Sequence, residues 1–367
     1  MRVAILGCGQ LARMLALASW PLNVRFAFLI EPGENTDCVQ GLGTIVERAP
    51  GADPGQLYEA LGRPDVITVE KEAVDTQLLQ ALSAYCAIHP NATAVYESQN
   101  RRREKMRLDA LGIPSTPHAF ASDAASLRAA ADKLGYPLVV KAAEHGYDGK
   151  NQWRLADSTA LEAFLQQQPQ GDWVVEAFIR FQCEVSLLAA RSATGEVRLY
   201  PAVLNHHVHG ILRSSIAPAQ GVEPAWISRM QDHLIRLLEH WQYVGMIAME
   251  CFVIDGGLVV NELAPRVHNS GHWTQQAAVT CQFENHVRAI LGLPLGNTDT
   301  AITGAMLNLI GVEATPQQAL SAHTTLHWYN KTVRPGRKVG HINIRHPEPE
   351  KVLAILQQLE QQFYPAG

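Results

Sequence analysis

Two apolar segments separated by a short glycine turn constrain this chain more than any other feature of its sequence. The first segment is Ala248–Val253, the second is Leu258–Leu263, and an Asp-Gly-Gly run lies between them. Partly β-branched segments on both sides of such a turn predict an antiparallel hairpin. If the turn centres on Gly256, Glu250 and Glu262 lie directly opposite each other on one face of the two strands.

Two carboxylates in that arrangement need a partner. Like charges placed across a strand pair repel each other and destabilise the sheet. A divalent cation between Glu250 and Glu262 would reverse the sign of the interaction, so we predict that these residues bind metal. A register slip of one or two residues would instead separate the carboxylates in solvent, and the hairpin pattern alone leaves that alternative open.

The segment after the hairpin is dense in chemistry. Residues 261–274 read NELAPRVHNSGHWT, which combines an amide, a carboxylate, an arginine and two histidines. Carboxylate and amide oxygens suit magnesium, and a guanidinium group suits the oxygens of a phosphate or carboxylate. The segment therefore predicts a site that handles both metal and phosphate.

Composition describes a globular protein with two or three domains. The chain has 367 residues, of which 47% are hydrophobic and 18% are charged. A formal net charge of -5 offers no basic surface for nucleic acid, so we expect no nucleic-acid partner. The six cysteines form no Cys-x-x-Cys pair, which suits a reducing compartment. Because we see neither a signal peptide nor a membrane span, we expect a cytoplasmic protein without a membrane partner.

The first region, residues 1–99, alternates strand and helix patterns. We predict buried strands at 3–6, 24–30 and 64–70, and a helix at 11–19. This alternation is typical of a small doubly wound parallel sheet.

A different region begins near residue 100. We predict helices and strands in mixed order there, with helices at 101–111, 121–134 and 349–363 and strands at 137–141 and 173–176.

A glycine-rich turn follows the first strand. Residues 7–12 read GCGQLA, which matches the G-x-G-x-x-A pattern of dinucleotide-binding proteins, and Glu31 ends the second strand where such proteins bind ribose. Taken alone, this pattern favours an NAD-linked oxidoreductase. The same turn geometry binds any phosphate or carboxylate, however, and we favour a solvent-facing strand end for Glu31.

Several motifs together resemble a known family. The 261–274 segment resembles the metal-and-phosphate motif of the ATP-grasp superfamily, and its HNSGHWT part resembles the 5-(carboxyamino)imidazole ribonucleotide synthetases of purine biosynthesis. At least five motifs occur in that family's order between Gly7 and His341. The resemblance implies an α/β protein of three-lobed ATP-grasp architecture with an amino-terminal doubly wound, Rossmann-like domain.

The resemblance also implies the domain limits. They are an amino-terminal α/β domain at 1–99, an ATP-grasp region at 100–291 with a lid-bearing subdomain at about 113–176, and a carboxy-terminal part at 292–367 that completes the substrate cleft.

The implied activity is that of an ATP-dependent ligase. Bicarbonate, activated by ATP as carboxyphosphate, would carboxylate the amine of 5-aminoimidazole ribonucleotide, with ADP and phosphate as the other products. Magnesium and a homodimer are implied as well. Another ATP-grasp carboxylate–amine ligase, an NAD-linked oxidoreductase and a non-catalytic nucleotide sensor on the same scaffold remain alternatives.

The resemblance assigns residues to each part of that reaction. The metal would bind Glu250 and Glu262. ATP would contact basic side chains, a glycine-containing lid, a hinge strand and acidic strand ends: Arg101, Lys105, Lys141, Gly146, Tyr147, Asp148, Gly149, Lys150, Asn151, Gln152, Glu176, Ala177, Phe178, Ile179, Glu184, His207, Asn261 and Glu262.

Catalysis and ribonucleotide binding are assigned in the same way. Arg266 and His268 would stabilise carboxyphosphate, and Asp148 would approach the substrate amine. The ribonucleotide would contact residues from both ends of the chain, with the last two at its 5′-phosphate: Gly9, Gln10, Leu11, Glu70, Asn269, Ser270, Lys331 and Arg337.

Four positions depart from the family pattern. In the lid, His145 and Asn151 replace glycines, which restricts the backbone, although asparagine tolerates positive φ better than most residues. Ala12 replaces a glycine after the first turn, and Lys71 stands where an apolar residue is commoner. These departures concern lid closure more than the class of reaction.

Overall fold

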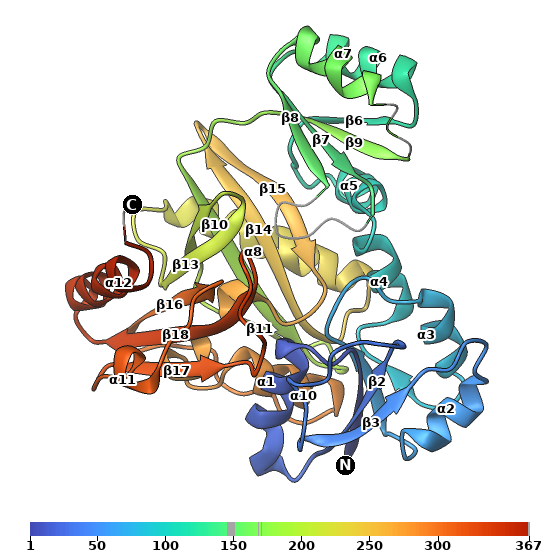
Figure 1. The fold of residues 1–367 in the computed structure, drawn as a ribbon, viewed down its shortest axis with the longest axis vertical. Helices are drawn as coiled ribbons and strands as arrows, with labels where there is room; N and C mark the ends of the chain where they lie inside the picture. The colour runs from blue at the N-terminus through green and yellow to red at the C-terminus, as the bar shows by residue number, and fades with distance from the viewer. Residues whose placement is uncertain (145–150, 168, 170, 366–367) are drawn as a thin grey trace.

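The computed structural model describes residues 1–144, 151–167, 169 and 171–365. Figure 1 shows a broad central sheet, an amino-terminal unit in blue beside it, and a small green and teal unit that stands away from the rest. The residues predicted at 145–150, among them Gly146, Tyr147, Asp148, Gly149 and Lys150, lie outside the described part of the chain.

The amino-terminal unit is a parallel sheet of five strands in the order β3-β2-β1-β4-β5. Its elements are β1 (Arg2–Leu6), α1 (Gln10–Ser19), β2 (Arg25–Ile30), β3 (Gly43–Glu47), α2 (Pro54–Ala60), β4 (Val66–Val69), α3 (Thr76–Leu82), β5 (Ala87–Ile88) and α4 (Ala92–Ser98), with a short 3-10 turn at Trp20–Leu22. The predicted strand at 64–70 is thus shorter, and the other predicted elements of this region agree within about one residue.

Both faces of this sheet are buried around β1, β2 and β4 because these strands are apolar at nearly every position. Val3 and Ile5 pack into one cluster with α1, whereas Ala4 and Leu6 pack into a second cluster with residues of α2 and α3. Alternating side chains therefore reach opposite faces, and helices cover both. The doubly wound arrangement expected from the sequence is confirmed.

The small unit is an antiparallel sheet of four strands in the order β6-β9-β7-β8. It follows α5 (Arg101–Ala110) and contains β6 (His118–Ala121), α6 (Ala124–Leu134), β7 (Leu138–Ala142), β8 (Gln152–Leu155), α7 (Ser158–Gln166) and β9 (Trp173–Ala177). The helix predicted from residue 121 begins at Ala124 instead. Ala121 ends a strand, and Asp123 caps the helix by accepting a hydrogen bond from the Ser126 backbone N–H.

The central sheet has nine antiparallel strands, with β15-β14-β10-β12-β13-β16-β18-β17 in order and β11 paired to β10. Its strands are β10 (Cys183–Arg191), β11 (Val197–Leu199), β12 (Val203–Val208), β13 (Ile211–Ala217), β14 (Gly245–Ile254), β15 (Gly257–Ala264), β16 (Thr303–Ile310), β17 (Thr324–Trp328) and β18 (Lys338–His346). The helices around it are α8 (Pro224–His240), α9 (Thr274–Ala277), α10 (Gln282–Ile290), α11 (Pro316–Ala319) and α12 (Pro349–Phe363), with a 3-10 turn at Asn269–Gly271.

The central sheet joins the last two predicted regions. β13 pairs with β16, so strands on both sides of the predicted limit at 291 share one hydrogen-bonded sheet. The segment 292–367 therefore extends this sheet as well as adding a helix, α12, that packs on β16 and β18. Among the described residues, no helix is long and apolar enough to span a bilayer.

Candidate active site

The predicted hairpin forms, and a β-bulge sets its register. Ile254 pairs with Gly257 across a two-residue turn, so an unbroken ladder would place Glu250 opposite Asn261. The ladder shifts by one residue between Cys251 and Glu250, and Glu250 pairs with Glu262. The opposition of the two glutamates is confirmed, but it depends on the bulge and not on a turn centred on Gly256.

The bulge also explains why two consecutive residues of β15 face one cavity, which lies between the small sheet and the central sheet. Side chains alternate between the faces of a regular strand, yet Asn261 and Glu262 both line this cavity. At a bulge, one extra residue interrupts the alternation and re-aims the side chains beside it. An amide oxygen and a carboxylate are thereby placed next to Glu250.

The cavity has a volume of about 260 Å³ and lies between the small sheet and the central sheet. Many of the residues predicted from the sequence line it: Arg101, Lys141, Gln152, Glu176, Ala177, Phe178, Ile179, Glu184, His207, Glu250, Asn261, Glu262, His268 and Asn269. Residues from distant parts of the chain are thus brought to one site.

Seven lining residues were not predicted: Thr116, Val139, Phe181, Gly210, Leu212, Phe252 and Lys338. Two of them form an aromatic wall, since the rings of Phe181 and Phe252 stack with centroids 4.6 Å apart. Phe252 could have been found from the sequence, because it lies two residues from Glu250 and so faces the same side of β14. Phe181 lies in a loop and carries no such signal.

Glu176 and the two predicted nucleotide lysines form a buried ion triad. Lys141 Nζ lies 2.6 Å from Glu176 Oε2, and Lys105 Nζ lies 3.1 Å from Oε1. Burial would raise the pKa of Glu176, but the two ammonium charges lower it to about 2. The Glu176 carboxylate is therefore held by two lysines.

Lys105, the other predicted nucleotide lysine, is more deeply buried than Lys141. Its side chain is 1% exposed and does not line the cavity, whereas Lys141 does. The Lys105 ammonium contacts the backbone oxygens of Val260 at 3.4 Å and Asn261 at 3.1 Å. Its contacts are thus with the protein backbone and Glu176.

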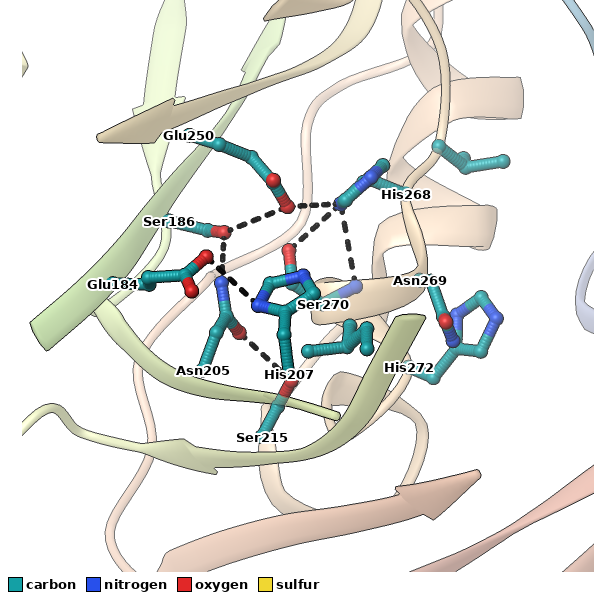
Figure 2. Close-up of polar contacts among 12 residues, drawn as sticks. Glu184, Ser186, Asn205, His207, Ser215, Glu250, His268, Asn269, Ser270 and His272 are labelled. Carbon is teal, nitrogen blue, oxygen red and sulfur yellow. Dashed lines mark hydrogen bonds and ion pairs between the residues drawn. The ribbon is translucent and has the colours of Figure 1, made fainter. Parts of the chain in front are cut away.

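Glu250 ends a chain of polar side chains that crosses the sheet (Figure 2). Ser215 donates to Asn205 Oδ1 at 2.8 Å, Asn205 Nδ2 donates to Ser186 Oγ at 2.5 Å, and Ser186 donates to Glu250 Oε1 at 3.4 Å. These residues come from the neighbouring strands β13, β12, β10 and β14. Each donor in this chain points toward Glu250, so the chain of hydrogen bonds orients the Glu250 carboxyl group.

The electrostatics of this carboxyl group fit a cation site. Burial, and then the charge of Glu262, raise the pKa of Glu250 to about 7. A divalent cation would relieve both effects, and the oxygen donors Glu250, Glu262 and Asn261 suit magnesium. Within the described ranges, no three His, Cys, Asp or Glu side chains are arranged to hold a metal, so further ligands would be water or phosphate oxygens, as is usual for magnesium.

Glu184 and His207 face each other on β10 and β12 of the central sheet, with 2.8 Å between Glu184 Oε2 and His207 Nδ1. Burial would lower the pKa of His207, but the hydrogen bond to Glu184 and the charges of Glu250 and Glu262 raise it. His207 therefore adds positive character to a cavity that four carboxylates also line.

Arg266 and His268 connect the cavity to the amino-terminal unit. Arg266 Nη2 lies 2.7 Å from Glu72 Oε1, and its Nη1 donates to the Val267 carbonyl. Burial, and then the charge of Arg266, hold the pKa of His268 well below its usual range, so the ring is neutral. Its Nδ1 accepts from the Ser270 backbone N–H at 3.3 Å, which assigns the ring proton to Nε2.

The glycine turn of the amino-terminal unit is occupied by the chain's own carboxylate. Glu70 accepts hydrogen bonds from the backbone N–H groups of Gly9 and Ala12 at the start of α1. A Cβ at Gly7 or Gly9 would lie 2.5 Å or 2.8 Å from the Glu70 side chain. The glycines therefore make room for Glu70, which fills the place that a dinucleotide phosphate would take. Glu31 is an exposed strand end, as favoured, and pairs with Arg48 at 3.2 Å.

The other predicted ribonucleotide residues surround this turn or the 3-10 turn at 269–271. Lys331 donates to the Gln10 side chain, and Arg337 Nη1 donates to the Thr332 carbonyl at 3.2 Å. Asn269 exchanges side-chain hydrogen bonds with Asn308 at 3.0 and 2.7 Å. Leu11 and Ser270 are buried.

Among the departures from the family pattern, Asn151 has φ +54°, the left-handed region in which asparagine is tolerated. Lys71 pairs with Glu34, which accounts for a cation at that position. His145 lies outside the described residues.

Three family models match successive parts of the chain. Residues 1–99 match the ribonucleotide synthetase preATP-grasp domain, residues 106–283 match the ATP-grasp domain, and residues 304–355 match the phosphoribosylaminoimidazole carboxylase C-terminal domain.

Full-length relatives and solved structures agree with these matches. The N5-carboxyaminoimidazole ribonucleotide synthase of Pseudomonas aeruginosa is 40% identical over 365 residues, 98% of this chain and 99% of the relative. That of Vibrio cholerae is 40% identical over 357 residues, 94% of this chain and 90% of the relative.

The crystal structure of the Thermus thermophilus synthetase matches with a TM-score of 0.91 at 39% identity, over 100% of this chain and 99% of that one. The Aspergillus clavatus enzyme in complex with ADP and 5-aminoimidazole ribonucleotide matches with a TM-score of 0.87 at 27% identity, over 98% and 97%. With matches over its whole length, a bulged carboxylate pair facing a cavity between two sheets, and an amino-terminal turn closed to dinucleotides, this chain belongs to the N5-carboxyaminoimidazole ribonucleotide synthase family of ATP-grasp ligases.

Proposed function

We propose that this protein carboxylates the amine of 5-aminoimidazole ribonucleotide with bicarbonate, using ATP, in purine biosynthesis. The observation that carries the proposal is the course of residues 261–270. This segment starts in the cavity with Asn261 and Glu262, passes His268 beside Glu250, and contacts the amino-terminal unit through Arg266 and Glu72. It thereby links a nucleotide-sized cavity to the turn assigned to the ribonucleotide.

ATP would occupy the cavity between the sheets. Lys141 and Arg101 line it and would neutralise phosphate charge, while Glu184 would accept from the ribose hydroxyls. The backbone N–H groups of Ala177 and Phe178 already donate to Pro117 and Pro137, so we assign the adenine-reading amide of the hinge to Ile179. Phe181 and Phe252 add an apolar wall for the base.

Magnesium would be held by Glu250, Glu262 and the Asn261 amide oxygen, and it would supply charge neutralisation at the β- and γ-phosphates. The chain's own part is to aim these ligands, through the Ser186–Glu250 contact on one strand and the bulge on the other.

Carboxyphosphate would form and be consumed beside Arg266 and His268. Bicarbonate is a poor electrophile, and phosphorylation gives it a leaving group that the amine can displace. Arg266 is held by Glu72 and presents its charge to the oxyanions, and the neutral His268 can donate from Nε2. Because carboxyphosphate hydrolyses in water, the burial of both groups favours amine attack over hydrolysis.

The ribonucleotide would bind across the amino-terminal turn. Gln10 and Lys331 are already in contact there, and Arg337 extends from the basic turn that carries Lys331. A guanidinium and an ammonium group suit the 5′-phosphate, which takes no part in the chemistry and can orient the amine.

The proposal includes a cytoplasmic homodimer. All six cysteines are free, which fits a reducing compartment. Sedimentation velocity at micromolar concentration tests the oligomeric state, and a single monomeric species would remove that part of the proposal.

The central test is the dependence of ADP release on the other substrates. With 5-aminoimidazole ribonucleotide and bicarbonate present, ADP should appear together with one equivalent of carboxylated product. The product is measured through the incorporation of labelled bicarbonate. ADP release that is indifferent to both compounds would overturn the assignment.

The metal assignment is tested separately with Glu262→Gln. The variant should lose most catalysis and bind Mn²⁺ more weakly, as measured by electron paramagnetic resonance in the absence of ribonucleotide. Wild-type Mn²⁺ affinity in the variant would rule out Glu262 as a ligand.

A further inference from the structure

The strand that carries the metal-site residues is an edge strand. β15 is the outermost strand of the central sheet, so one side of it pairs with no other strand in the described part of the chain. Peptide groups on such an edge need other partners, and without them the strand position is weakly defined. The linker before the small unit supplies some of them: Val260 N–H donates to the Pro114 carbonyl at 2.8 Å, and Thr116 N–H donates to the Val260 carbonyl at 3.4 Å.

Two consecutive side chains of α5 supply further hydrogen-bond partners for the β15 backbone, on both sides of the bulge. Lys105 Nζ donates to the backbone oxygens of Val260 and Asn261. Glu104 Oε2 accepts from the Leu263 backbone N–H at 3.0 Å. The backbone is therefore gripped immediately before and immediately after Glu262, at the point where the ladder shifts register.

The same lysine connects this strand to the small sheet. Lys105 Nζ lies 3.1 Å from Glu176 Oε1, Lys141 Nζ lies 2.6 Å from Glu176 Oε2, and Lys141 Nζ lies 3.4 Å from Asn261 Oδ1. Since Lys105 also holds the Asn261 backbone, four residues close a ring that spans both walls of the cavity. An ammonium group has three N–H donors, and Lys105 directs them at a carboxylate and two carbonyls.

We propose that Lys105 is a positioning residue that does not contact ATP. It fixes the bulge that aims Asn261 and Glu262, and it sets their distance from Lys141 across the cleft. The inference rests on the proposed function, since it concerns where the metal and phosphates are held. It assigns the two lysines different tasks: Lys141 binds the nucleotide, and Lys105 shapes the site that binds the metal with it.

Equilibrium binding of ATP with and without Mg²⁺ separates these tasks. Lys105→Met and Lys141→Met form a matched pair, because each replaces a lysine of the same triad by an uncharged side chain of similar length. Lys141→Met should weaken ATP about tenfold or more both in EDTA and in Mg²⁺, since a charge-assisted contact is lost. Lys105→Met should change ATP affinity in EDTA by less than about threefold. Mg²⁺ increases the ATP affinity of wild type, and in Lys105→Met this increase should be roughly tenfold smaller. If Lys105→Met weakens ATP binding in EDTA as much as Lys141→Met does, the inference is overturned.

A measurement on the wild-type protein keeps the inference testable if Lys105→Met does not fold. Acetylation of surface amines followed by mass spectrometry should modify Lys141 and show its protection by ATP, whereas Lys105 should stay unmodified in both states. Modification of Lys105 that ATP prevents would place its ammonium on the nucleotide and overturn the inference. If wild type binds no ATP in either assay, the proposed function fails, which is a distinct result.

Discussion

Two buried glutamates in this molecule occupy places made for anions, and they are held by different means. Glu70 lies at the start of α1 and accepts from the backbone N–H groups of Gly9 and Ala12. Glu176 lies between the ammonium groups of Lys105 and Lys141. Both carboxyl groups are buried, with 8% and 3% of the residue exposed.

Their pKa values move in opposite directions. Burial raises the pKa of Glu70, and the two backbone hydrogen bonds only offset part of that effect. At Glu176, two full charges outweigh burial and lower the pKa to about 2. Backbone hydrogen bonds thus offset burial only in part at Glu70, whereas two ammonium groups outweigh it at Glu176.

The largest expected effect tests this difference through stability. Glu176→Gln leaves two largely buried ammonium groups without a counter-charge and should lower the free energy of unfolding by about 3–5 kcal/mol. Glu70→Gln keeps one acceptor oxygen and should cost only about 1–2 kcal/mol. Urea denaturation measures the loss of unfolding free energy in both variants. Equal losses would show that backbone N–H groups and ammonium groups support a buried carboxylate equally well.

A pH dependence extends the comparison to Glu250, a buried carboxyl group that lies opposite a second carboxylate, Glu262. The pKa of Glu250 is about 7 in the folded protein against an ordinary 4.5, so the folded state binds more protons in that window. The free energy of unfolding of metal-free protein should therefore fall as pH rises from 4.5 to 7, with a contribution of about 3 kcal/mol from this group.

Glu250→Gln isolates that contribution, because Glu104, whose pKa burial raises to about 8, adds a slope of the same sign. Denaturation in EDTA across this pH range should give a flatter profile for the variant. An unchanged profile would mean that Glu250 is ionised without metal.

A smaller effect concerns the anion that the amino-terminal turn would receive from outside. Arg337→Ala should raise the KM for aminoimidazole ribonucleotide by roughly ten- to a hundredfold, because it removes one charge-assisted phosphate contact of about 1.5–3 kcal/mol. The KM for ATP should stay within about twofold. The dephosphorylated nucleoside serves as control, since wild type and variant should use it equally badly. A variant that loses ATP affinity instead would show that the basic turn around Arg337 serves another site.

The smallest effect tests why Gly9 is a glycine. Its φ of -85° suits any residue, but an added Cβ would lie 2.8 Å from Glu70 Oε1. Gly9→Ala should therefore cost about 1–2 kcal/mol, because the carboxyl group must shift. In a Glu70→Ala background the same change should cost almost nothing. Equal costs in both backgrounds would mean that the glycine serves the backbone and not the carboxylate.

Local patterns in the sequence were sufficient for much of the fold. Apolar runs on both faces of β1, and the long amphipathic helix at the carboxy terminus, predicted elements that the structure confirms, because burial of those side chains has few solutions. The hairpin at 248–263 was predictable for the same reason, whereas the opposition of its glutamates depends on a bulge that the apolar pattern does not reveal. β6 was missed, since its short run before the Asp123 cap resembles the start of the helix.

Contacts between distant segments decided the rest. The sequence presents Lys105 and Lys141 as equivalent lysines, but only the packing of α5 against the edge of β15 buries one and leaves the other in the cavity. Similarly, GCGQLA describes a phosphate-binding turn, and nothing in this motif indicates that the carboxylate of Glu70, 61 positions after Gly9, will fill it. Motifs report which groups a site can use, whereas burial and charge pairing, which depend on the whole fold, decide what each group is free to bind.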